Sequence, residues 1–410
     1  MLIKKFLIGN SVRTFHCTTK CPEDVGIEMQ EVVNHALKKG NELISFAYNA
    51  NKKDYPNITR PTLYVYVRED SLDDINAFTD GKDIYLSALA TFGMESYIHE
   101  RLNTKRKDGD VLVPDWLENT THVKLYDRIL ELIVAHELMH IWHGHQQWKY
   151  HTLHYITKEN CLDEVLHEKT DFADPPAISI NKIIDSLIIN SGGVTCQSVY
   201  DKNYIQQILE LDADRGAITV VMQKLHNELQ PFLMEFNKKE LTANRKAAIL
   251  KTHGYELGVT IGAAALMLGF FDQRHKISSF DSLNYLLVSD HPIPAIRFFE
   301  MDKEFLAMIG SMYANDTIPH WLINETNAFV YDILAHDNGE MHIGNCFWMP
   351  ALTFEAQNFT VLLMRGWNHI QNSLQAFAQV SIREQYEKEY LEVFQEWVKF
   401  DINGNYIRKE

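Results

Sequence analysis

The part of this chain best suited to chemistry is a His-Glu-x-x-His sequence, since residues 136–145 read His-Glu-Leu-Met-His-Ile-Trp-His-Gly-His. His136 and His140 are four positions apart, so on an α-helix both imidazoles project from one face, one turn apart. That spacing lets two ring nitrogens reach one Zn²⁺ at about 2.0–2.1 Å. Glu137, beside the first histidine, is placed to take a proton from a metal-bound water. This stretch therefore predicts a zinc site with its own general base.

A third ligand is expected from a second helix, residues 204–225, in which apolar positions recur with helical spacing between carboxylates. Glu210 and Asp214 lie on one face of it, and an acidic pair on an otherwise apolar helix is unfavourable without a partner. Glu210 would complete a His₂Glu set with water in the fourth position, as in catalytic zinc sites. Asp214 would accept the free N–H of a ligating histidine. The alternative is a solvated helix face with ordinary charges.

Two more histidines follow the first pair. His143 lies about 10 Å along a straight helix from His136, too far for both to bind one ion. His145 does not fit the metzincin spacing, which needs glycine at position 143 and histidine at position 146. We expect neither residue to be a ligand.

Together, His-Glu-x-x-His and Glu-x-x-x-Asp resemble the gluzincin metallopeptidases. The form Glu-Leu-Asp-Ala-Asp-Arg, residues 210–215, resembles the family of the CAAX prenyl proteases and the related heat-shock membrane peptidases. Residues 289–297, Ser-Asp-His-Pro-Ile-Pro-Ala-Ile-Arg, are similar to that family's downstream His-Pro segment. Residues 75–81, Ile-Asn-Ala-Phe-Thr-Asp-Gly, resemble its Asn-Ala-Phe edge strand. The four pieces occur in the family's order and cover roughly residues 62–300.

The resemblance implies roles for residues outside the ligand set. His291 and Arg297 would donate hydrogen bonds to the oxyanion formed during peptide hydrolysis. Asn76, Ala77 and Phe78 would form the edge strand to which an extended substrate adds. The alternatives are that the His-Pro segment only begins a helix, that Arg297 pairs with an acidic neighbour, and that residues 76–81 form an ordinary turn.

The local pattern predicts an α+β, gluzincin-like fold with a small sheet and helices around the site. We expect strands at 63–67 and 83–86, and a helix from Pro22 to a closing Gly40. An N-terminal lobe at 1–125 would carry the edge strand, and 126–300 would form the zinc-binding lobe. An insertion at 151–203 could act as a lid. Residues 301–410 would form a mostly helical extension, with an apolar stripe on a helix at 382–400 that could bind a protein partner.

Composition limits the classes of protein. A net charge of −16 argues against nucleic acid or an anionic membrane surface as the main partner. Five scattered cysteines indicate a reducing compartment, and no secretory signal is evident, so we expect a cytoplasmic protein. The longest apolar run, residues 257–271, is shorter than the ~20 residues that span a bilayer, which departs from the membrane-embedded relatives.

The sequence therefore predicts a zinc-dependent endopeptidase acting on a protein or peptide. One alternative is a narrow-specificity protease that cuts a single host protein, by analogy with the Lit-type phage-exclusion proteases. The other is a catalytically silent, zinc-bound sensor that keeps the peptidase fold. The intact Glu137 argues against the silent alternative.

Overall fold

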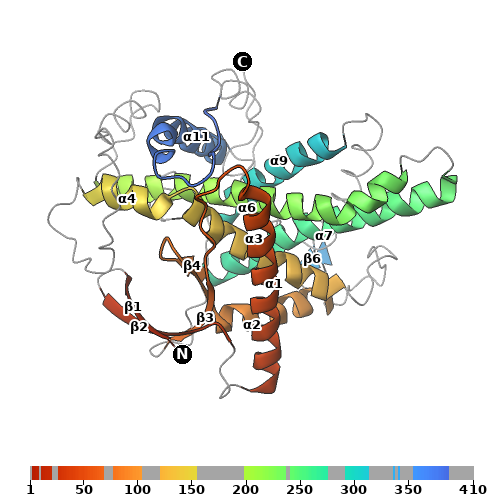
Figure 1. The fold of residues 1–410 in the computed structure, drawn as a ribbon, viewed down its shortest axis with the longest axis horizontal. Helices are drawn as coiled ribbons and strands as arrows, with labels where there is room; N and C mark the ends of the chain where they lie inside the picture. The colour runs from red at the N-terminus through yellow and green to blue at the C-terminus, as the bar shows by residue number, and fades with distance from the viewer. Residues whose placement is uncertain are drawn as a thin grey trace.

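The structure, a computed structural model, describes residues 2–8, 11–20, 26–68, 77–103, 121–154, 198–236, 241–275, 291–313, 336–337, 340–341 and 354–386. Within these residues the fold is α+β and mostly helical, with one small curved sheet beside a group of packed helices (Figure 1). The α+β class expected from the sequence is confirmed.

The sheet has five strands in the order β1-β2-β3-β5-β4. β3 and β5 are parallel and the other neighbours are antiparallel. The strands are β1 (Leu2–Ile8), β2 (Ser11–Thr18), β3 (Leu63–Arg68), β4 (Ala77–Thr79) and β5 (Ile84–Ser87). Strands are thus present at both positions expected from the sequence, near 63–67 and 83–86. The N-terminal hairpin β1–β2 was not predicted.

The two faces of the sheet differ because side chains alternate along each strand. Leu63 and Val65 belong to the main core with the helices, whereas Tyr66 joins an aromatic cluster on the other face. The ring of Phe78 packs into that cluster, stacked on Tyr85 at a centroid distance of 5.0 Å. The Phe78 side chain therefore anchors β4 to the sheet, and any contact of Phe78 with a substrate strand would involve its main chain.

Helix α3 runs through the centre and contacts α1, α2, α6, α7 and β4 (Figure 1). Its apolar residues are buried almost all round, so the helix that carries His-Glu-x-x-His lies inside the core. The described helices are α1 (Ile27–Asn51), α2 (Ala88–Asn103), α3 (Thr121–Trp142), α4 (His145–His154), α6 (Ser198–Phe236), α7 (Ala243–His275), α9 (Pro294–Met312) and α11 (Phe354–Leu374). Apart from the five-stranded sheet, β6 (His336–Asp337) and β7 (Glu340–Met341) pair antiparallel.

Two expected helix boundaries are wrong. Helix α1 does not end at Gly40 but continues to Asn51. Gly40 lies where α1 packs on the sheet and on α3, and an added Cβ would collide with Leu63. This glycine permits close packing and does not end the helix. At the other end of the chain, residues 382–386 are not helical, so no helix begins at Ile382; residues 387–400 lie outside the described part.

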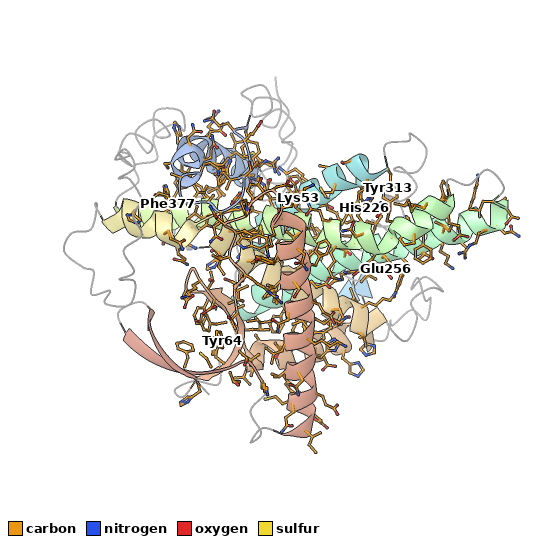
Figure 2. The ribbon with its side chains drawn as sticks, in the orientation of Figure 1. Lys53, Tyr64, His226, Glu256, Tyr313 and Phe377 are labelled. Carbon is orange, nitrogen blue, oxygen red and sulfur yellow. The ribbon has the colours of Figure 1, made fainter. Side chains whose placement is uncertain are left out.

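Among the described residues, buried apolar side chains form three clusters, one of them the aromatic cluster on the sheet. The largest joins α1, the sheet, α3, α6, α7 and α9, and so contains residues from both sides of the expected boundary near position 125. A second cluster joins α11 to α4, the start of α9 and the N-terminal part of α6. Phe377, labelled in Figure 2, belongs to that cluster. Its ring centroid lies 5.2 Å from that of His151 on α4. The expected domain limits and the role of the 151–203 insertion stay predictions.

The apolar run at residues 257–271 lies inside α7 and is largely buried against other helices. Among the helices that the structure describes, none has both the length and the hydropathy needed to cross a bilayer. The cytoplasmic location stays a prediction.

Candidate metal centre

The three expected ligands converge between α3 and α6, which pack against each other along their lengths. Nε2 of His136 lies 3.1 Å from Nε2 of His140 and 3.1 Å from Oε2 of Glu210. Nε2 of His140 lies 3.5 Å from the other carboxylate oxygen of Glu210. All three side chains are buried. The structure thus brings together side chains that are separated by seventy positions in the sequence.

These distances fit a divalent ion. Ligand atoms 2.0–2.1 Å from a tetrahedral Zn²⁺ lie ~3.3 Å from one another, close to the observed spacings. Two imidazole nitrogens and a carboxylate oxygen are also the donors that zinc accepts in catalytic sites. The arrangement is therefore suited to a metal ion held by His136, His140 and Glu210.

Asp214 lies one turn beyond Glu210 on α6 and faces the other ring nitrogen of His136. Its Oδ1 is 2.9 Å from Nδ1 of His136, which is the position that the sequence predicted for it. Nε and Nη2 of Arg297 donate to the same carboxylate at 2.7 and 2.8 Å. Arg297 thus pairs with an acidic neighbour, the alternative that the sequence left open, and that neighbour also faces His136.

The carboxylates around the ligands favour a positive charge. Burial lowers the pKa of His136, but Asp214 and Glu210 outweigh it and raise that pKa to about 10. Burial would raise the pKa of Glu210, yet His291 and His140 hold it well below its usual range. The pKa of His140, in contrast, is lowered to about 3, chiefly by burial. A proton on His136, or a divalent ion between the ligands, would supply the charge that these carboxylates attract.

Glu137 is positioned by α3 itself, next to the first ligand. It is buried, and burial raises its pKa to about 7, although the neighbouring His136 lowers it. A carboxylate with a pKa near neutrality can both accept and release a proton at physiological pH. Without a metal ion Glu137 therefore exchanges its proton near neutral pH, and a divalent ion bound by the neighbouring side chains would lower its pKa.

His291 reaches the site from the residues just before α9, where Pro294 occupies the first turn. Its Nε2 lies 3.6 Å from Oε2 of Glu210, and its side chain is 47% exposed. His291 therefore stands on the solvent-accessible side of a ligand set that is otherwise buried. The structure brings it to the candidate metal centre, as the sequence predicted.

The predicted substrate strand is described only in part. Asn76 lies outside the described residues, whereas Ala77 and Phe78 begin β4. β4 is the last strand of the sheet, with no further strand beside it among the described residues, and α3 packs against it. A sheet edge thus adjoins the helix that carries two of the ligands.

A second group of buried side chains was missed by the sequence reasoning. His143, His145 and Asp212 offer ligand-type atoms that all lie within 4.8 Å of one another. Asp212 accepts hydrogen bonds from Nδ1 of His143 and, at 3.0 Å, from Nε2 of His145. Burial would raise the pKa of Asp212, but His143 and His145 lower it. The available signal was Asp212 itself, a third carboxylate on an apolar helix, together with two histidines left without a role.

Gly144 explains how His145 reaches this group. Gly144 has φ of +71°, the left-handed conformation with which glycine commonly follows the end of a helix. The chain turns there, so that α3 ends and α4 begins at His145. Nδ1 of His145 then lies 2.8 Å from Nδ1 of His140. The turn therefore connects the second group to the candidate metal centre.

Comparisons with known proteins add no relative to this description. No family model matches the sequence, and neither the curated proteins nor the solved structures include a match. The geometry of the site is therefore the basis for inferring the function.

Proposed function

We propose that this chain is a zinc-dependent endopeptidase with a gluzincin-like catalytic unit. The observation that carries the proposal is the convergence of His136, His140 and Glu210, with Glu137 buried beside them. Zn²⁺ bound there would lower the pKa of a coordinated water toward 7 and polarise a peptide carbonyl. The substrate class is a protein or peptide.

The chain's own residues supply the proton transfers. Glu137, buried next to His136, takes a proton from water and later gives it to the leaving amine. The half-exposed His291 donates to the developing oxyanion. Support for a peptide substrate comes from the edge strand β4, whose main chain could pair with an extended segment.

The test is Glu137→Gln, which keeps the shape of the side chain but removes its basicity. We expect unchanged zinc content by elemental analysis and a loss of peptide cleavage of about 10²–10⁴-fold. Cleavage is measured by labelling new peptide N-termini in a lysate incubated with each protein. Glu42→Gln, an exposed carboxylate on α1, is the matched control and should cleave as the wild type does.

Three results would overturn the proposal in different ways. Equal numbers of new N-termini from wild type and Glu137→Gln would exclude this general base. Zinc binding with no cleavage by the wild type would favour the silent zinc-bound protein. Zinc content unaffected by His136→Gln would show that the ion binds elsewhere. New N-termini on many lysate proteins would indicate a general peptidase, whereas new N-termini on a single protein would indicate the narrow-specificity alternative.

A further inference from the structure

The second group of histidines touches the candidate metal centre through one contact. Nδ1 of His140 and Nδ1 of His145 face each other at 2.8 Å, and both rings are buried. Two neutral imidazoles can make this contact only if one nitrogen carries the hydrogen and the other accepts it. The direction of this hydrogen bond determines whether the other nitrogen of each ring carries a hydrogen or a lone pair.

Asp212 determines the answer. Its carboxylate can only accept, and it lies 3.0 Å from Nε2 of His145, so that nitrogen must carry the hydrogen. A neutral His145 with hydrogen on Nε2 has a lone pair on Nδ1. His140 must then donate from its own Nδ1, which leaves its Nε2 unprotonated and directed at His136 and Glu210. That is the tautomer in which His140 can bind a metal ion.

From this geometry we infer that His145 and Asp212 are positioning residues that fix His140 in its metal-binding tautomer. The inference rests on the proposed zinc site at His136, His140 and Glu210. Histidine ligands generally donate their second ring N–H to an acceptor that orients the ring and increases its basicity. Here the acceptor is another histidine, whose state is set in turn by a carboxylate.

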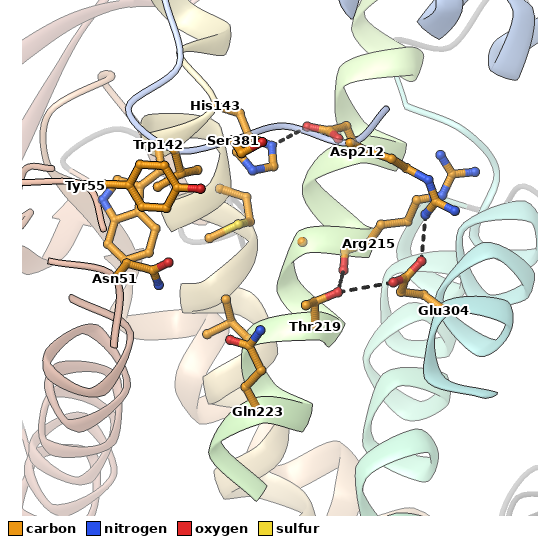
Figure 3. A pocket seen from close by; sticks show the side chains of 15 residues that line it. Asn51, Tyr55, Trp142, His143, Asp212, Arg215, Thr219, Gln223, Glu304 and Ser381 are labelled. Carbon is orange, nitrogen blue, oxygen red and sulfur yellow. Dashed lines mark hydrogen bonds and ion pairs between the residues drawn. The ribbon is translucent and has the colours of Figure 1, made fainter. Parts of the chain in front are cut away.

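His143 completes the chain of hydrogen bonds. Its Nδ1 donates to the same Oδ2 of Asp212 that His145 contacts, which holds the carboxylate in place. His143 and Asp212 also line a pocket of about 290 Å³ between α1, α3 and α6 (Figure 3). None of the three zinc ligands is among the residues that line it. The hydrogen bonds from His140 through His145 and Asp212 to His143 thus connect the candidate metal centre with a separate pocket.

The same three residues could instead be a second metal site, and the contact between the rings argues against that. A metal on Nε2 of His145 would place the hydrogen on its Nδ1. With zinc on Nε2 of His140, two N–H groups would then face each other at 2.8 Å. Neutral rings therefore cannot serve both sites at once in this arrangement. One ion per chain is the expected stoichiometry.

The decisive comparison is His145→Leu with His145→Asn. Leucine fills a similar volume but cannot accept from His140, whereas the Oδ1 of asparagine takes the position of the Nδ1 atom. We expect His145→Leu to weaken zinc binding by about 10–100-fold, measured by competition with a chromophoric chelator, and His145→Asn to restore most of it. His151→Leu, on the same helix α4, is the matched control and should bind zinc as the wild type does.

Two further readouts separate positioning from a general loss of structure. The visible spectrum of the Co²⁺-loaded protein should change in His145→Leu and return in His145→Asn, because it reports ligand orientation. A downfield N–H proton signal of the zinc-loaded wild type should be lost in the leucine variant only. If His145→Leu does not fold, Asp212→Leu takes its place, because leucine removes the acceptor that asparagine would keep, and the same loss of zinc affinity is expected.

The outcomes distinguish failure of this inference from failure of the proposed function. One zinc per chain with equal affinity in wild type and His145→Leu would overturn the positioning role alone. Two zinc ions per chain in the wild type would also overturn it, because His145 would then be a ligand. No zinc bound by the wild type or by His151→Leu would overturn the metal site, and with it both proposals.

Discussion

Arg297 has two possible roles, as an oxyanion donor and as the partner that holds Asp214, and one experiment separates them. The guanidinium makes two hydrogen bonds to the carboxylate, and the two side chains are 12% and 1% exposed. Removing one member of a buried ion pair leaves the other charge uncompensated, at a cost of ~3–5 kcal/mol. Because Arg297 is slightly exposed, we expect Arg297→Met and Asp214→Asn each to lower the free energy of unfolding by ~3 kcal/mol.

The double variant Arg297→Met/Asp214→Asn should lose much less stability than the sum of the single variants, because neither charge is then left unpaired. The free energies come from urea unfolding of the metal-free protein in a chelator. We expect a coupling of at least ~2 kcal/mol between the two positions. Both single variants should also bind zinc more weakly, by about 10–100-fold, because Asp214 no longer orients His136 correctly.

Additive losses in the double variant, within ~0.5 kcal/mol, would refute the reasoning about the buried pair. A second result would reverse the assignment of Arg297. If Arg297→Met keeps the stability and zinc affinity of the wild type but loses cleavage, the guanidinium acts on the substrate. The oxyanion role implied by the family resemblance would then be the correct one.

Two further predictions concern the folded state. Gly144→Ala should lower the free energy of unfolding by ~2 kcal/mol or more, since φ is +71° and an added Cβ would overlap the backbone of Phe377. Gly26→Ala, where an added Cβ meets nothing within 4 Å, should change stability little, and equal melting temperatures for the two variants would contradict this. The buried His253, hydrogen-bonded to the Tyr313 hydroxyl, has a pKa lowered to about 4, chiefly by burial. As the pH falls, His253 is protonated in the unfolded chain near pH 6.5 but in the folded protein only near pH 4. The free energy of unfolding is therefore constant with respect to this group above pH 6.5 and falls by ~2–3 kcal/mol as the pH drops to about 4. His253→Gln should show a smaller fall in urea unfolding across this range, and parallel curves for the two proteins would exclude the effect.

The sequence predicted the ligand helices because their signals are local. Histidines four apart, and carboxylates four apart on an apolar helix, define a face from periodicity alone. An acidic side chain on a buried face also requires a partner, and this requirement led to Glu210 and Asp214 before any contact was known. The strands at 63–68 and 84–87 were also predicted from local signals, namely β-branched and aromatic residues next to turn or charged residues.

The features that the sequence did not predict depend on contacts between distant segments. Gly40 and Gly144 have the same side chain, yet one allows close packing inside α1 and the other turns the chain after α3. Nothing in the neighbouring residues distinguishes the two cases. The role expected for His143 was limited to a ligand on one straight helix, so its hydrogen bond to Asp212 on α6 was not considered. The pairing became visible only when the register of the two helices was known.

The register between α3 and α6 determines both the candidate metal centre and the neighbouring group of His143, His145 and Asp212. One stretch of α6 supplies the ligand Glu210 and the two carboxylates, Asp212 and Asp214, that contact the histidines of the site. Gly216 lets α6 approach α3 closely, because any side chain there would overlap Met139, which lies between the ligand positions on α3. A shift by one turn would separate all three carboxylates from their partners at once. Since apolar side chains of α3 and α6 pack together in the main core, we predict that the two helices keep this register with and without bound Zn²⁺.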